Sequence, residues 1–356
     1  MLNNSPKKDF GLKFRTGEIV EVRSKEEILR TLDENGRLDQ LPFMPEMLKY
    51  CGQKLKVYKR ADKTCDTIEK TGGRRMNNTI HLEETRCDGE AHGGCEAGCL
   101  LFWKEAWLKR VQPKMEIGVS KSSIPKGTNS LASTGGVYNC TETDLARATR
   151  KVSEPGKEND DAFSCQATEL RNATSPLAWW DVRQYVRDLV SGNVRIPEFI
   201  HVISIAIFNV IQRYRRGRGY PFVPLPKLRK TPTDVLYLRP GELVHVKTKE
   251  EIIATLDTKG KNRGLSFDVE MIRYCGGEFK VQRRVEKIID EKTGKIRRLP
   301  NDCVILEGVT CTARLSRERL FCPRSIFPYW REVWLKRVDP YYKSGVTAKI
   351  SRSVCE

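Results

Sequence analysis

An internal duplication constrains the fold of this 356-residue chain more than any other sequence feature. Residues 17–87 align without a gap with residues 241–311, at an offset of 224, and 29 of the 71 aligned pairs are identical. The second copy then gains three residues, and the register resumes at an offset of 227, where Trp-Lys-Glu-Ala-Trp-Leu-Lys-Arg-Val (103–111) matches Trp-Arg-Glu-Val-Trp-Leu-Lys-Arg-Val (330–338). Self-similarity at a fixed offset indicates repeated structural units. We therefore predict two homologous modules, module one (17–111) and module two (241–338).

Each module is predicted to be mostly β. The pattern Gly-Glu-x-Val-x-Val at 17–22 alternates as a half-buried strand does, and further alternating segments begin at Lys54 and Thr79. Ser24 followed by Lys-Glu-Glu-Ile predicts a short capped helix to about Leu32, and residues 43–50 predict a second one. This order of a strand, a helical insertion and several short strands resembles the broad SH3-like group. The resemblance implies an α+β chain with two small SH3-like barrels.

The segment between the modules has a different character. Residues 176–190 and 196–216 are predicted helices. The second is apolar nearly all round its first half, which predicts that it is buried between the modules. The full division of the chain is an N-terminal tail (1–16), module one (17–111), a Ser/Gly/Lys-rich linker (112–136), a helical middle segment (137–220), a proline-rich connector (221–240), module two (241–338) and a C-terminal tail (339–356).

Four metal-binding residue types lie within thirteen positions of module one. Cys87, His92, Cys95 and Cys99 have the spacing C-x4-H-x2-C-x3-C, with glycines between them. Thiolate and imidazole together suit tetrahedral zinc, and a set of four ligands is typical of a structural site. The alternative is a group of buried thiols without a metal. An iron–sulfur cluster is less favoured because its ligands are normally all thiolates.

The aligned loop of module two keeps only part of this set. Cys311 and Cys322 align with Cys87 and Cys95, but the loop has no histidine. One interpretation is a decayed site with two buried thiols. The other is a second, long-range metal site formed by four thiolates: Cys140, Cys165, Cys311 and Cys322.

The excess of basic residues is the second sequence feature that points to a function. The chain has 64 Lys and Arg against 46 Asp and Glu, a formal net charge of +18. Basic residues interleaved with Tyr214 predict phosphate binding and base stacking, and the loop 312–321 adds further arginines. The predicted anion-binding residues are Arg213, Arg215, Arg216, Arg218, Arg314, Arg317 and Arg319. The alternative is a basic helix C-terminus followed by a solvated linker.

The N-terminal residues lack the apolar run of a secretion signal, and the longest apolar stretch (199–211) is short for a bilayer. We therefore expect a cytoplasmic protein without a transmembrane segment, whose cysteines are metal ligands or free thiols. Because common catalytic motifs are missing from the sequence, we favour a non-catalytic, zinc-stabilised scaffold that binds RNA, DNA or another polyanion. Two alternatives remain, namely a protein–protein adaptor, and an enzyme or accessory subunit of a biosynthetic pathway with its chemistry near Cys140, Cys165 and module two.

Overall fold

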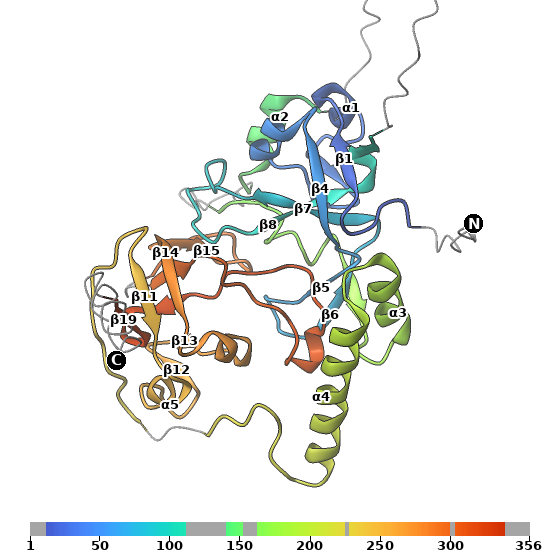
Figure 1. Cartoon of the computed structure of the whole chain (residues 1–356). Coiled ribbons are helices and arrows are strands. Elements are labelled where there is room, and N and C mark those ends of the chain that lie inside the picture. The colour runs from blue at the N-terminus through green and yellow to red at the C-terminus, as the bar shows by residue number, and fades with distance from the viewer. Residues whose placement is uncertain (1–11, 112–139, 152–161, 225–227, 300–302, 339–356) are drawn as a thin grey trace, which may run out of the picture.

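The computed structural model describes residues 12–111, 140–151, 162–224, 228–299 and 303–338. The predicted linker (112–136), the tail 339–356 and most of the tail 1–16 lie outside the described residues. Helices and antiparallel sheets are mixed, as the α+β class requires. Two sheets form separate bodies, and the helices Val182–Ser191 and Ile196–Tyr214 of the middle segment lie at one side of them (Figure 1).

Module one contains a five-stranded antiparallel sheet of order β8-β7-β4-β1-β9. Its strands are β1 (Ile19–Val22), β4 (Lys54–Arg60), β7 (Thr79–Arg86), β8 (Leu100–Lys104) and β9 (Leu108–Arg110). Between β1 and β4 lie α1 (Lys25–Leu29), β2 (Arg37–Leu38), β3 (Leu41–Pro42) and the 3-10 helix η1 (Pro45–Tyr50). The hairpin β5 (Lys63–Cys65) and β6 (Gly73–Arg75) precedes β7, and η2 (Glu105–Trp107) precedes β9. Both predicted short helices are confirmed, the first with a capping box between Ser24 and Glu27.

Module two contains a second five-stranded sheet, of order β18-β17-β14-β11-β19. Its strands are β11 (Leu243–Val246), β14 (Glu278–Arg284), β17 (Cys303–Leu306), β18 (Trp330–Arg331) and β19 (Leu335–Arg337). The remaining elements are α5 (Lys249–Ile253), β12 (Lys261–Asn262), β13 (Leu265–Ser266), η3 (Val269–Tyr274), β15 (Lys287–Ile289), β16 (Ile296–Arg298), η4 (Arg317–Arg319) and η5 (Glu332–Trp334). The first strand pairs with the second and the last in both sheets.

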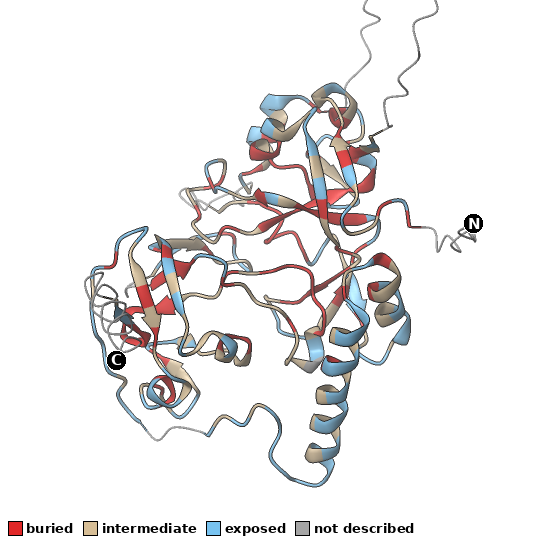
Figure 2. Ribbon diagram, in the orientation of Figure 1, coloured by how far each residue is buried: buried red, intermediate tan, exposed pale blue. Residues whose placement is uncertain are grey.

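The core of each module contains a buried tryptophan at an aligned position. Trp107 and Trp334 are fully buried, and each indole Nε1 donates to a threonine hydroxyl, to Thr31 at 3.1 Å and to Thr255 at 2.9 Å. Buried residues follow the strands of both sheets in Figure 2. A buried indole N–H usually has an acceptor, and here it is the threonine that lies two residues beyond the end of each short helix.

The middle segment packs mainly on module one. It contains α2 (Glu142–Ala148), β10 (Ser175–Leu177), α3 (Val182–Ser191) and α4 (Ile196–Tyr214). The helix predicted at 176–190 begins later, at Val182, because Pro176 and its neighbours form β10 against β6 and Asp181 caps the helix. The helix predicted at 196–216 is confirmed as α4.

The predicted burial of α4 is wrong. Only Val202 on this helix is buried, whereas Ile200 is 62% exposed and Ile207 is 55% exposed. One face of α4 packs on Leu320 and Phe321 of module two, and the rest of the helix projects away from the protein (Figures 1 and 2). By length and apolar composition alone, α4 would suffice to cross a membrane. An apolar sequence predicts that a helix needs a partner, but not that this chain supplies it.

The modules pack on each other reciprocally. The loop 87–99 of module one lies on the β15–β16 hairpin of module two, where the Glu96 carboxylate accepts from the Lys287 N–H at 3.1 Å. In the other direction, the loop 311–326 of module two lies on the β5–β6 region, where Arg324 Nη1 donates to Thr67 Oγ1 at 2.7 Å. The long loop of each module therefore covers the hairpin of the other.

A buried histidine predicts how stability changes with pH. His81 is fully buried on β7 and its Nδ1 is 2.8 Å from the Leu101 carbonyl, so Nδ1 carries the proton of a neutral ring. Burial lowers its pKa to about 3. Because the unfolded chain binds this proton near pH 6.5 and the folded chain does not, His81 makes the free energy of unfolding fall as the pH drops from about 6.5 toward 3, by up to about 1.4 kcal/mol per pH unit.

We expect His81→Ile to flatten this pH dependence, because the aligned residue of module two, Ile305, is fully buried on β17 and carries no titratable group. Urea unfolding of both proteins between pH 4.5 and 7 measures the difference. Equal slopes for the variant and the parent would contradict the assignment to His81.

Candidate metal centre

The predicted ligand loop joins two neighbouring strands, β7 and β8. Cys87 follows β7 and Cys99 precedes β8, and the Cys87 N–H donates to the Cys99 carbonyl at 2.9 Å. Gly89 has φ +80°, and a Cβ there would lie 2.1 Å from the Cys95 carbonyl oxygen. Only glycine permits so close an approach in this conformation, so the turn at Gly89 folds the loop back over its own cysteines.

A further candidate ligand, which the sequence analysis did not identify, is the carboxylate of Glu46. Glu46, on η1, places Oε1 3.2 Å from Cys87 Sγ and 3.4 Å from His92 Nδ1. His92 Nε2 is 3.4 Å from the same sulfur. One donor atom from each of Glu46, Cys87 and His92 lies within 4.8 Å of the others. This group has the donor types and the spacing of a metal site.

The other predicted ligands line the same small cavity. It has a volume of about 40 Å³ and is lined by Cys87, His92, Cys95, Cys99 and, from the middle segment, Cys165. Module two contributes to its wall, because the Ile289 N–H donates to Cys95 Sγ at 3.3 Å. The structure therefore brings Cys87, His92, Cys95 and Cys99 to one cavity, at the junction of the two modules.

Burial disfavours the charged form of the candidate ligands in this cavity. It raises the pKa of Glu46 and of Cys87, and it raises the pKa of Cys99 to about 11. It lowers the pKa of His92 to about 4. Metal ligands must be deprotonated, and a bound cation stabilises thiolate and carboxylate. A metal ion would therefore reverse the protonation that burial alone imposes on Glu46 and the cysteines.

Module two provides an internal comparison for Glu46. The aligned carboxylate, Glu270, is also buried but accepts hydrogen bonds from the backbone N–H groups of Arg314, Leu315 and Ser316, at 2.8 to 3.1 Å. Glu46 meets a thiol and an imidazole instead, and its Oε2 is buried with no hydrogen-bond partner among the described residues. An orphaned buried carboxylate oxygen is costly, so it points to a cation or another donor at this position.

The same three residues also resemble a cysteine–histidine–carboxylate relay. In such a relay the base activates the thiol, and the pKa of the cysteine is lowered. Here the carboxylate lies 3.2 Å from the sulfur itself, and burial and this negative charge raise the pKa of Cys87. The geometry therefore favours metal binding over nucleophilic catalysis.

The structure does not bring the predicted second set of four cysteines together. Cys140 packs in the module one core near Gly36, and Cys165 lines the cavity described above. Cys311 and Cys322 lie in a separate cluster with Cys65. Cys165 shares its cavity with Arg324 of the module two loop, but Cys311 and Cys322 of that loop belong to the other cluster. Burial raises the pKa of Cys140 and raises that of Cys165 to about 12, which opposes activation of either thiol.

The predicted basic residues divide into two groups. Arg213, Arg215, Arg216 and Arg218 are exposed at the C-terminal end of α4, where Tyr214 is 88% exposed. In the loop of module two, by contrast, Arg314 pairs with Glu198 at 2.5 Å and Arg319 pairs with Asp268. These two arginines hold the loop to its surroundings, and the Arg317 side chain lies outside the described residues.

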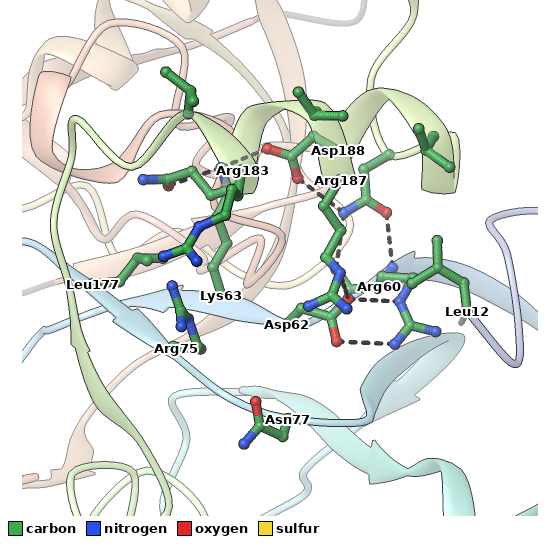
Figure 3. A pocket seen from close by; sticks show the side chains of 15 residues that line it. Leu12, Arg60, Asp62, Lys63, Arg75, Asn77, Leu177, Arg183, Arg187 and Asp188 are labelled. Atoms are coloured by element: carbon green, nitrogen blue, oxygen red, sulfur yellow. Dashed lines mark hydrogen bonds and ion pairs between the residues drawn. The ribbon is translucent and has the colours of Figure 1, made fainter. Parts of the chain in front are cut away.

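A larger cleft, of about 460 Å³, separates α3 from the β5–β6 hairpin (Figure 3). Its basic side chains face carboxylates. Lys63 pairs with Asp188 at 2.5 Å, both of them buried, and Arg75 pairs with Asp181 at 2.7 Å. These pairs do not balance the lining, because five basic side chains line the cleft against the carboxylates of Asp62 and Asp188, and Asp181 is shared by Arg75 and Arg183.

Comparison with protein-family models, with curated proteins and with solved structures finds no match for this chain.

Proposed function

We propose that this chain is a binding protein in which two SH3-like modules, fixed by zinc, present a basic surface to an anionic partner. Support for the SH3-like assignment comes from the strand order. In each sheet the first four strands are sequential neighbours, a 3-10 helix precedes the fifth, and the fifth pairs with the first. The alignment of the two copies and their equivalent tryptophan contacts support a tandem arrangement.

The zinc ion would be held by Cys87, His92 and Glu46 or by the cysteines beside them, and its role would be structural. The loop that carries these ligands also contacts module two. Arg283 Nη2 donates to the Glu96 carbonyl at 2.8 Å, and Ile289 donates to Cys95. A metal that fixes the loop would therefore also fix the orientation of the two modules.

The observation that carries the binding proposal is the basic end of α4. Arg213, Arg215 and Arg216 are exposed and have no carboxylate partner among the described residues, and Tyr214 between them is almost fully solvent-exposed. Arg218 lies over the Phe222 ring, 4.7 Å from its centroid. Guanidinium groups beside exposed aromatic rings bind phosphates and stack on bases, so single-stranded RNA or DNA is the simplest partner.

The test is fluorescence anisotropy with a labelled single strand at several salt concentrations. We expect affinity to fall as salt rises, and Arg215→Ala/Arg216→Ala to reduce the salt slope by about 0.7 for each lost phosphate contact. The matched control is Arg147→Ala/Arg183→Ala, which removes two exposed arginines that already pair with Asp144 and Asp181. Absence of binding at low salt, or equal losses in both double variants, would exclude this proposal.

A second candidate partner is an anionic membrane surface, which the exposed stripe of α4 favours. Ile196, Ile200, Ile207, Phe208 and Ile211 are exposed on one side of this helix, next to the arginines. An apolar helix face with adjacent basic residues is typical of interfacial helices. Co-sedimentation with phosphatidylserine vesicles separates the two candidates. Ile200→Ser/Ile207→Ser should abolish vesicle binding and leave nucleic-acid binding intact.

A further inference from the structure

The cleft between α3 and the β5–β6 hairpin contains two kinds of basic side chain. Arg60 and Lys63 are buried and already hold carboxylates, because Arg60 bonds Asp62 and Lys63 pairs with Asp188. The other three cations of the lining are accessible to solvent: Arg75, Arg183 and Arg187. A ligand that enters the cleft can therefore contact these three guanidinium groups, which we call the cleft arginines.

Two of the cleft arginines converge on one carboxylate oxygen. Arg75 Nη2 donates to Asp181 Oδ2 at 2.7 Å, and Arg183 Nη2 donates to the same oxygen at 2.9 Å. Two guanidinium charges thus share one carboxylate, which leaves one of them uncompensated. Like charges held this close repel each other, and an anion in the cleft would relieve this repulsion.

Arg187 has fewer partners than the other cleft arginines. It lies one turn after Arg183 on α3, so both side chains extend from the same face of the helix toward the hairpin (Figure 3). Its Nε is 3.7 Å from Asp62, whose two oxygens already accept from Arg60. Among the described residues, Arg187 makes no hydrogen bond, and its N–H groups are therefore available to a ligand.

Comparison of the two copies separates the structural cations of the cleft from those that are particular to it. Lys63, which holds Asp188, aligns with Lys287 of module two, whereas Arg75 aligns with Leu299. The other two cleft arginines belong to the middle segment, which lies outside the duplication. The cleft arginines are thus an addition to module one and not a general feature of the module.

Apolar side chains complete the lining of the cleft. Val182 and Val186 of α3 are 68% and 49% exposed, and Leu177 of β10 lies among the lining residues as well. The volume of about 460 Å³ is that of a small-molecule site, in which apolar walls surround a few charged groups. Guanidinium groups suit phosphate, because they present two parallel N–H donors to its oxygens. We propose that this cleft binds a small organic phosphate, whose phosphate group contacts the cleft arginines and whose apolar part lies on Val182 and Val186.

Isothermal titration calorimetry of the full chain with phenyl phosphate at low salt tests this site. We expect phenyl phosphate to bind, inorganic phosphate to bind more weakly, and phenol not to bind. Arg75→Gln and Arg187→Gln should each weaken phenyl phosphate binding by about tenfold or more, because each removes charge-assisted hydrogen bonds. The matched control is Arg195→Gln, which changes an exposed arginine that follows α3 and does not line the cleft, and it should keep the affinity of the parent protein.

A second pair of variants tests the apolar part of the site. Val182→Ser/Val186→Ser should weaken the binding of phenyl phosphate, because the phenyl ring loses apolar contacts, and it should leave the affinity for inorganic phosphate unchanged. Equal losses for the two probes would contradict the placement of the apolar part on these valines.

This proposal stands or falls separately from the basic end of α4. Arg215→Ala/Arg216→Ala should keep the affinity for phenyl phosphate, and excess phenyl phosphate should not displace a labelled single strand from the parent protein. Displacement would show that the strand occupies the cleft, and it would exclude a separate small-molecule site. Absence of phenyl phosphate binding, or equal losses for Arg187→Gln and Arg195→Gln, would also overturn the proposal. If Arg75→Gln does not fold, Arg187→Gln decides, because Arg187 makes no hydrogen bond among the described residues that its loss could disturb.

Discussion

Cys87→Ser is expected to remove zinc from the metal centre and to lower the free energy of unfolding by about 4 kcal/mol at zinc concentrations a thousandfold above the dissociation constant. Cys87 has the central place, because its sulfur lies 3.2 Å from Glu46 and 3.4 Å from His92. A ligand that binds only the folded chain stabilises it by mass action, and the variant would lose this contribution. Urea unfolding with and without a chelator measures the effect. The chelator should destabilise the parent protein and leave the variant unchanged.

The aligned glutamates provide a matched control for this prediction. Glu46→Gln should weaken zinc binding, because it removes the negative charge beside Cys87 and His92. Glu270→Gln should destabilise module two, because Glu270 accepts three backbone hydrogen bonds, and it should leave zinc affinity at the metal centre unchanged. If chelator treatment does not change the unfolding of the parent protein, the metal centre does not stabilise this fold.

The sequence patterns correctly predicted those features that are set by residues close together in the sequence, such as helix starts and the ligand loop. The capping boxes of Ser24 with Glu27 and of Thr248 with Glu251 fix the starts of α1 and α5, and both are visible in the sequence. The ligand loop was found for the same reason, because its cysteines and histidine are close in sequence. Glu46 could have been found from its identity with Glu270 in the duplicated copy, which marks a position that both modules retain.

Contacts between distant segments were not predictable in this way. Cys65 meets Cys322 only because each module covers the hairpin of the other, and no local pattern encodes that packing. The basic loop of module two was interpreted as an anion site, yet Arg314 and Arg319 are held by Glu198 and Asp268, which are distant in sequence. The burial of α4 was wrong for a related reason, since apolar composition does not show which surface covers the helix.

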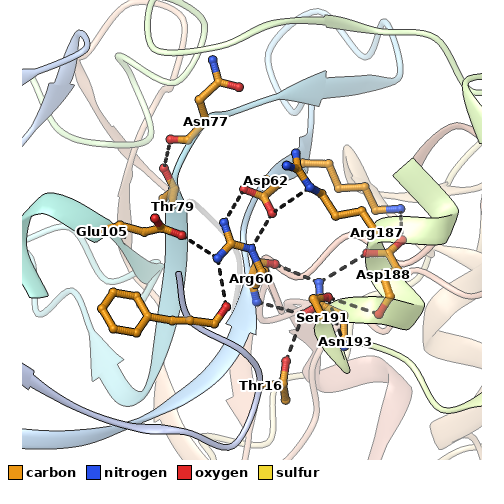
Figure 4. Close-up of polar contacts among 12 residues, drawn as sticks. Thr16, Arg60, Asp62, Asn77, Thr79, Glu105, Arg187, Asp188, Ser191 and Asn193 are labelled. Carbon is orange, nitrogen blue, oxygen red and sulfur yellow. Dashed lines mark hydrogen bonds and ion pairs between the residues drawn. The ribbon is translucent and has the colours of Figure 1, made fainter. Parts of the chain in front are cut away.

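A buried arginine at the base of module one gives the second large prediction. Arg60 is 2% exposed and lies among carboxylates and backbone carbonyls (Figure 4). Its Nε donates to Asp62 at 2.6 Å, and its Nη1 donates to Glu105 at 2.5 Å and to the Phe14 carbonyl at 2.9 Å. The side chain of Asn193, which follows α3, accepts from the Arg60 backbone N–H and donates to the Arg60 carbonyl. Arg60 on β4 thus links the segment before β1, η2 and the middle segment.

Arg60→Met is expected to lower the free energy of unfolding by about 3 to 5 kcal/mol, because it leaves the buried Glu105 carboxylate without its cation and leaves the half-buried Asp62 with only Arg187, at 3.7 Å. The aligned Arg284→Met should cost less. Its carboxylate partner, Glu332, also accepts from the backbone N–H groups of Leu236, Tyr237 and Leu238, at 2.6 to 3.0 Å, and these bonds remain in the variant. Glu105→Gln in the Arg60→Met background should recover part of the loss, because it removes one of the unpaired charges. Urea unfolding of the four proteins measures these differences. If Arg60→Met costs no more than Arg284→Met, the three backbone N–H groups at Glu332 do not compensate for the loss of its arginine, and the prediction is wrong.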